Sequence, residues 1–145
     1  MSAKTLLPID AELLSHLRCQ AQENERRRIH YDLRTTCHDT SQRMLNILEP
    51  DTKVPIHRHC MTSETMVCLE GCLDEVLYEP RPNASVPADA ETWHNDDDFV
   101  EVGRCRVCPS EGKYGVQVPP GVWHTVVVHE PSAIFEAKDG AYEGM

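Results

Sequence analysis

The chain has 145 residues, a length that predicts a single domain with a sizeable hydrophobic core. Aspartate and glutamate (24) outnumber lysine and arginine (14), and the formal net charge of −10 disfavours nucleic acid and anionic membranes as partners. Neither a membrane span nor an apolar stretch long enough for a secretory signal is recognisable in the sequence, so we expect a cytoplasmic protein.

A helix is predicted over residues 10–24. Asp10 can cap its N-terminus, and apolar residues recur at the spacing of one helix face, at Leu13, Leu14, Leu17 and Ala21. This face predicts packing on the outside of the domain or against a second subunit of a homodimer. We assign residues 1–34 to this helix and a connecting segment, and residues 35–145 to a β-rich body.

Three adjacent arginines, Arg26, Arg27 and Arg28, follow the helix. In an acidic chain such a cluster is typically a solvated turn or an ion-paired patch. Guanidinium groups also bind phosphate and carboxylate, so the cluster is alternatively a site for a substrate anion. The sequence leaves both interpretations open.

Residues 42–48 are predicted to form a strand. Because strand side chains alternate between faces, the inward set is either Gln42, Met44, Asn46 and Leu48 or the residues between them, which include Arg43. The sequence does not decide between the two.

A histidine pair follows at His57 and His59. On a strand these two residues point the same way, so their imidazoles converge. After a short turn, Glu64 opens a return strand that is expected to end at Gly71, and this places its carboxylate beside the histidines. Two imidazoles and a carboxylate suit a divalent transition metal such as Zn, Fe, Ni or Mn, and the ligand types do not choose among them.

Short apolar segments separated by turns continue to the C-terminus and predict a barrel or jelly-roll of eight or more strands. The expected strands are residues 73–78, 99–102, 104–107, 113–118, 125–128 and 133–137, with a polar loop over residues 79–98.

Seven cysteines are an odd number, and without an export signal they are expected to be reduced thiols. Cys105 and Cys108 form a CxxC motif, but no second motif completes a zinc knuckle. The sequence assigns no role to this pair.

A fourth metal ligand is offered by His124. The preceding Pro119-Pro120-Gly121 predicts a rigid turn, which delivers His124 to the start of a β-branched strand. At this position we expect its imidazole to face inward.

These motifs resemble those of the cupin superfamily. The first cupin motif, HxH, four residues, E, six residues and G, is met by His57, His59, Glu64 and Gly71. The second, PxG, two residues and H, is met at Pro119, Gly121 and His124, although Lys113 and Val128 replace the glycine and asparagine of the broad pattern. The resemblance implies an all-β cupin jelly-roll barrel over residues 35–145 and metal binding by the three histidines and Glu64.

A narrower resemblance is to WbuC-type cupin-fold metalloproteins. It rests on residues 42–44, 55–59, 119–125 and 136–142, with Ala141 where that family commonly has proline before Tyr142. That family is named from bacterial surface-polysaccharide gene clusters, and the resemblance implies a bound metal without a settled reaction.

Four ligands leave coordination positions for water or substrate, as in a catalytic metal site. Glu136 and Lys138 share a strand face and are candidates for an acid/base pair, or alternatively for a surface ion-pair ladder. Gln42, Arg43 and Tyr78 are candidates for substrate binding.

Two classes of function therefore remain. The first is a metal-dependent isomerase or oxygenase that acts on a small polar metabolite such as a sugar derivative. The second is a non-catalytic module that binds or senses a small ligand or the metal itself. Neither class is expected to involve nucleic acid or a membrane.

Overall fold

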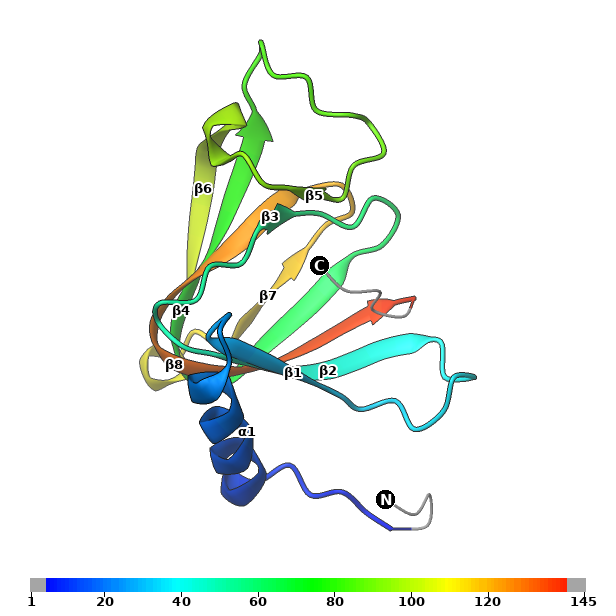
Figure 1. Ribbon diagram of the computed structural model, residues 1–145, viewed down its shortest axis with the longest axis vertical. Coiled ribbons are helices and arrows are strands. Elements are labelled where there is room, and N and C mark those ends of the chain that lie inside the picture. Colours follow the sequence, from blue (N-terminus) through cyan, green and yellow to red (C-terminus); the bar gives the residue numbers. More distant parts are fainter. Residues whose placement is uncertain (1–4, 141–145) are drawn as a thin grey trace.

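Two long antiparallel strands, β4 (Glu64–Pro80) and β8 (Trp123–Asp139), form the spine of the computed structural model, which describes residues 5–140 (Figure 1). Each strand passes through both halves of a curled antiparallel sheet, and shorter strands flank the pair in each half. The confirmed all-β jelly-roll is therefore built on two strands that bend.

The flanking strands differ between the two halves. In one half lie β1 (Arg28–Asp32), β2 (Ser41–Leu48) and β7 (Gly115–Val118). In the other half lie β3 (Ile56–His57), β5 (Thr92–Trp93) and β6 (Phe99–Val107). The predicted loop over residues 79–98 contains β5 and a 3₁₀ turn, η1 (Asp96–Asp98), and a second 3₁₀ turn, η2 (Pro109–Glu111), precedes β7.

The bend in β4 occurs at Gly71, where the pairing register with β8 shifts. Gly71 has φ +109°, and a Cβ atom there would lie 2.3 Å from Ser132 Oγ and 2.6 Å from the Pro131 carbonyl oxygen. The backbone N–H of Cys72 donates to the same Ser132 hydroxyl at 3.1 Å. Glycine is needed here because no side chain fits between the strands.

The prediction that one strand ends at Gly71 and another ends between Val128 and Ala133 is wrong. In the structure β4 runs on through the predicted separate strand at residues 73–78, and β8 joins the two predicted closing strands. Both segments stay hydrogen-bonded to each other across irregular positions, so turn-like residues within them mark bulges instead of strand ends.

Helix α1 (Ala11–Glu23) confirms the predicted N-terminal helix. Asp10 caps it by accepting from the Leu13 N–H at 3.0 Å. Its buried residues pack on the outer face of the sheet formed by β2 and β8, in a cluster that includes Leu14, Leu17, Ala21, Leu45, Ile47 and Ala133. Among residues 5–140, no helix has the length and apolar character that crossing a membrane requires.

The connection after the helix holds an element that the sequence analysis missed. Residues 28–32 form strand β1, which pairs along its whole length with β2. The division of the chain at residue 34 remains a prediction. Strand β2 turns Gln42, Met44, Asn46 and Leu48 toward the interior of the barrel, which decides between the two faces left open by the sequence.

Candidate metal centre

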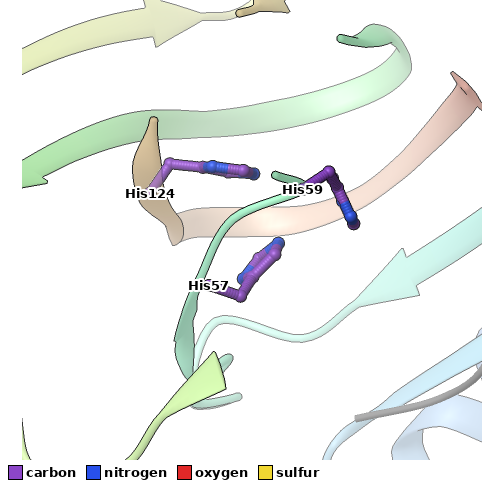
Figure 2. A group of neighbouring side chains, drawn as sticks. All are labelled: His57, His59 and His124. Atoms are coloured by element: carbon purple, nitrogen blue, oxygen red, sulfur yellow. The ribbon is translucent and has the colours of Figure 1, made fainter. Parts of the chain in front are cut away.

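Three imidazoles converge in the interior of the barrel (Figure 2). His57 lies on β3, His59 follows two residues later, and His124 is the second residue of β8, where it pairs with His57. One ring nitrogen from each residue lies within 4.8 Å of the other two. This is the spacing at which three imidazoles can bind one ion.

Hydrogen bonds fix which nitrogen two of these rings present to the cluster. His57 Nδ1 donates to the Pro55 carbonyl, and His124 Nδ1 donates to the Val122 carbonyl, each at 2.8 Å. In a neutral ring the proton on Nδ1 leaves the Nε2 lone pair free to bind a metal. His124 Nε2 is buried and has no hydrogen-bond partner among the described residues. A buried, unsatisfied acceptor that faces two other imidazoles is chemically suited to a cation.

Glu64, at the first position of β4, supplies the carboxylate. Its Oε2 lies 3.0 Å from His59 Nε2, and its Oε1 lies 3.9 Å from His124 Nε2. Burial alone would raise the pKa of Glu64, but the hydrogen bond with His59 and the neighbouring imidazoles lower it below its ordinary value. The carboxylate is therefore ionised at neutral pH.

Burial also sets the charge of the histidines. It lowers the pKa of His57 to about 4, helped by the proximity of His124, and it lowers the pKa of His124 as well. Both rings are thus neutral at pH 7, which is the form that binds metals.

The two predicted motifs are held together by the backbone. Gly121 has φ +79° in the proline-glycine turn, and its N–H donates to the His59 carbonyl at 2.8 Å. Arg58 points away from the cluster, stacks 4.4 Å from the ring centroid of Trp123 and donates to the Ala90 carbonyl. These contacts fix Arg58, the residue between the two histidines. His59 is therefore held in position although strand β3 ends at His57.

The histidines line a cavity of about 160 Å³, together with three glutamates. Besides Glu64 these are Glu136 on β8 and Glu75 on β4, and Glu75 Oε1 lies 3.9 Å from His124 Nε2. Sequence reasoning missed Glu75. Glu75 lies two residues after the core residue Leu73, so strand alternation could have placed it on the inward face. The irregular pairing around Gly71, however, hides how that face relates to Glu64.

Glu75 and Glu136 differ from Glu64 in the direction of their pKa shifts. Burial and the charge of Glu64 raise the pKa of Glu136 to about 8, and burial with both neighbouring glutamates raises the pKa of Glu75 well above its ordinary value. In the metal-free protein at neutral pH Glu136 is therefore mainly a carboxylic acid, and the pKa of Glu75 is shifted in the same direction. As an acid, Glu136 can donate a hydrogen bond inside the cavity, whereas the ionised Glu64 can only accept one.

This difference predicts a pH dependence of the stability of the metal-free protein. The folded state keeps the Glu136 proton up to about pH 8, while the unfolded chain has already lost it, so stability falls as pH rises. Between pH 7 and 8 we expect Glu136 to lower the free energy of unfolding by about 1 kcal/mol. Urea unfolding at a series of pH values measures this effect. Between pH 7 and 8 the free energy of unfolding should fall less steeply with pH in Glu136→Gln than in the wild type, and an equally steep fall would contradict the assigned protonation of Glu136.

The other predicted site residues are only partly brought together. Gln42 lines the cavity, and its buried Oε1 has no hydrogen-bond partner in the described part of the chain. Arg43 instead pairs with Asp39, and the Lys138 ammonium donates to the carbonyls of residues 139 and 140. Neither is among the residues that line the cavity, so Glu136 and Lys138 do not form a pair there.

Tyr78 is placed elsewhere as well. It lines a different cavity, and its ring lies edge-on to Phe99 with a centroid distance of 6.4 Å. Trp123 packs in the same apolar cluster, facing away from His124 as strand alternation predicts.

The CxxC cysteines also separate in the structure. Cys105 is exposed, whereas Cys108 is buried within 4.8 Å of Cys72 and Glu111. Glu111 is held in an ion pair with Arg106 at 2.7 Å. All seven cysteines are free thiols, as predicted.

Comparison with solved structures supports the cupin fold. A cupin superfamily protein from Desulfitobacterium hafniense superposes with a TM-score of 0.55 at 11% identity, covering 98% of this chain and 95% of that one. A protein from Thermus thermophilus superposes with a TM-score of 0.55 at 14% identity, covering 94% and 100% of the two chains.

A third similar structure is a sugar phosphate isomerase of the cupin superfamily from Silicibacter pomeroyi, with a TM-score of 0.53 and 18% identity. The match covers 82% of this chain but only 61% of that one. At these identities the similarity shows the fold alone.

Sequence comparison adds a family to this fold. No curated protein matches the sequence significantly. Residues 9–86 match the model of a family described as a domain of unknown function, DUF6016. This match runs from the start of α1 through β4 and includes His57, His59 and Glu64. The chain therefore has the cupin fold and belongs to the DUF6016 family.

Proposed function

We propose that the protein binds one divalent transition metal through His57, His59, Glu64 and His124 and is a metal-dependent enzyme acting on a small polar metabolite. The observation that carries this proposal is the buried Nε2 of His124, which faces two imidazoles and a carboxylate without a hydrogen-bond partner among the described residues. The donor set fits Zn, Fe, Ni or Mn.

The cavity beside the ligands supplies groups for positioning a substrate. Bound there, a divalent ion would polarise a carbonyl or enediol oxygen as a Lewis acid. Glu75 and Glu136 line the same cavity, so their carboxyl groups can hydrogen-bond to substrate oxygens and take up or release a proton there. The amide of Gln42 can orient a hydroxyl group, because its buried oxygen is an open acceptor.

These proton-carrying groups favour an isomerase, in which a proton moves between neighbouring carbons, over an oxygenase. The similar structure of a sugar phosphate isomerase supports a sugar derivative as the kind of substrate. We further propose a WbuC-type cupin. This narrower assignment rests on the sequence resemblance, and Ala141 and Tyr142, which belong to it, lie outside the described residues. A homodimer and a cytoplasmic location remain predictions.

The proposal predicts activity that depends on the metal. Protein stripped with a chelator and then reloaded with each candidate metal is incubated with sugar phosphates, nucleotide sugars and keto acids, and products are followed by NMR. We expect turnover of at least one compound in a reloaded sample and none in the stripped protein. Metal-dependent binding without turnover across the panel would instead identify a non-catalytic binding or sensing module.

A further inference from the structure

The three consecutive arginines after α1 have different surroundings. Arg27 has φ +58°, and its guanidinium donates to Asp51 at 3.1 Å and to the Gln22 carbonyl. Arg26 and Arg28 instead line the cavity that holds the histidine cluster. The left-handed backbone at Arg27 turns the chain into β1, so its side chain diverges from those of its two neighbours.

Strand pairing explains why Arg28 faces the cavity. Arg28 and His30 lie opposite Leu48 and Asn46 of β2, two residues that also line the cavity. The four side chains therefore share one face of the sheet. Since Arg26 and His30 are exposed while the metal-ligand histidines are mostly buried, the basic residues form the outer end of the cavity.

The position of these arginines is fixed by Thr52. Its hydroxyl donates to the Arg26 carbonyl at 2.6 Å. Nη1 of Arg28 donates to Thr52 Oγ1 at 3.3 Å and to the Lys53 carbonyl at 2.9 Å. These contacts fix the backbone of Arg26 and the Nη1 group of Arg28 at the rim. In a solvated turn, by contrast, the arginine side chains would be held only by water.

We propose that the substrate of this cavity carries a phosphate or carboxylate group, which Arg26 and Arg28 bind at the rim while the uncharged part of the molecule reaches the histidine cluster. The inference rests on the proposed function, because it names the class of substrate for the same site. Guanidinium groups bind both anions through paired, charge-assisted hydrogen bonds.

The distribution of charge in the cavity sets the orientation. Three carboxyl side chains, Glu64, Glu75 and Glu136, line the inner end beside the histidines, and the two arginines of the lining lie at the rim. The rim carries Arg26 and Arg28 in a chain whose formal net charge is −10, so it is a local attraction for anions in an acidic protein. The cavity of about 160 Å³ limits the uncharged part to a small polar body.

The test uses three small probes that share a skeleton: glycerol, glycerol 3-phosphate and glycerate. Binding is measured by calorimetry at low ionic strength, with metal-free protein so that the anion cannot bind to a metal. We expect glycerol 3-phosphate or glycerate to bind at least about tenfold more tightly than glycerol, because each adds charge-assisted hydrogen bonds. Which of the two gains more distinguishes a phosphate site from a carboxylate site.

Variants then locate the site. Arg26→Gln and Arg28→Gln should each weaken binding of the preferred anion by about tenfold to a hundredfold. Arg27→Gln removes the same charge from the same segment but outside the cavity, where the Arg27 guanidinium is paired with Asp51, and should change binding less than about twofold. Arg28→Lys keeps the charge and should retain part of the affinity, which separates anion binding from a folding defect.

Two results would overturn the inference: equal binding of all three probes by the wild-type protein, or equal weakening in Arg27→Gln and the two rim variants. Metal content, measured on the same variants, keeps this test separate from the proposed function. Retained metal without anion preference refutes only the anion site. Arginine-dependent anion binding in a protein that takes up no metal refutes only the metal enzyme.

Discussion

Replacing His124 with alanine is expected to lower the affinity for a divalent metal by about a hundredfold or more, because a direct ligand matters at least as much as the residues that support one. Free metal at a hundred times the wild-type Kd should raise the free energy of unfolding of the wild type by about 2.7 kcal/mol. The same concentration should stabilise His124→Ala by well under 1 kcal/mol. Thermal and urea unfolding with and without metal measure both values.

The matched control is His129→Ala. His129 lies on the same strand, β8, but its Nε2 bonds to Asp74 at 2.9 Å outside the cavity, so metal stabilisation should be unchanged. The metal-free His124→Ala protein should remain folded, since the substitution removes one hydrogen bond, from Nδ1 to the Val122 carbonyl, together with a buried Nε2 that lacks a partner among the described residues. Equal metal stabilisation of wild type and His124→Ala would remove His124 from the site.

Replacing Gly71 with alanine is expected to lower the free energy of unfolding by about 3 kcal/mol or more, the range of severe backbone and packing defects. The added Cβ would lie 2.6 Å from both the Pro131 carbonyl oxygen and Ser132 Cα, which are backbone atoms that cannot rotate away. The φ of +109° is an additional strain for any residue with a side chain. Urea unfolding of the purified variant, or its failure to fold, measures this effect.

Two other glycines calibrate the expected loss. Gly121 has φ +79° with open space around it, so its alanine variant should lose only about 1–2 kcal/mol from the backbone alone. Gly103 has its nearest contact at 3.6 Å and an ordinary φ, so alanine there should be close to neutral. If Gly71→Ala were no worse than Gly121→Ala, the close approach of β4 and β8 at the bend would be wrong.

The sequence predicted the residues of the histidine cluster because their spacing is local. His57 and His59 lie on one side of a short segment, and the turn that ends at Gly121 delivers His124. The convergence itself is not local, since it also depends on the hydrogen bond from Gly121 to the His59 carbonyl. Spacing could therefore predict which residues meet, but not the tautomers that prepare their nitrogens.

The sequence could not predict features that depend on irregular backbone. A register shift around Gly71 separates Glu75 from the pattern that identified Glu64, so a third cavity carboxyl was missed. The left-handed conformation of Arg27 decides which arginines reach the cavity, and arginine gives no sequence signal for it. Lys138 was predicted from strand alternation, which fixes a face but not what covers it.

The most direct test of the metal centre is an anomalous-difference map from crystals grown with one of the candidate metals, recorded at the absorption edge of that metal. The site predicts one strong peak per chain, about 2.0–2.2 Å from a ring nitrogen of His57, His59 and His124 and from a Glu64 oxygen. No peak at this position, or a peak only beside Cys72 and Cys108, would contradict it.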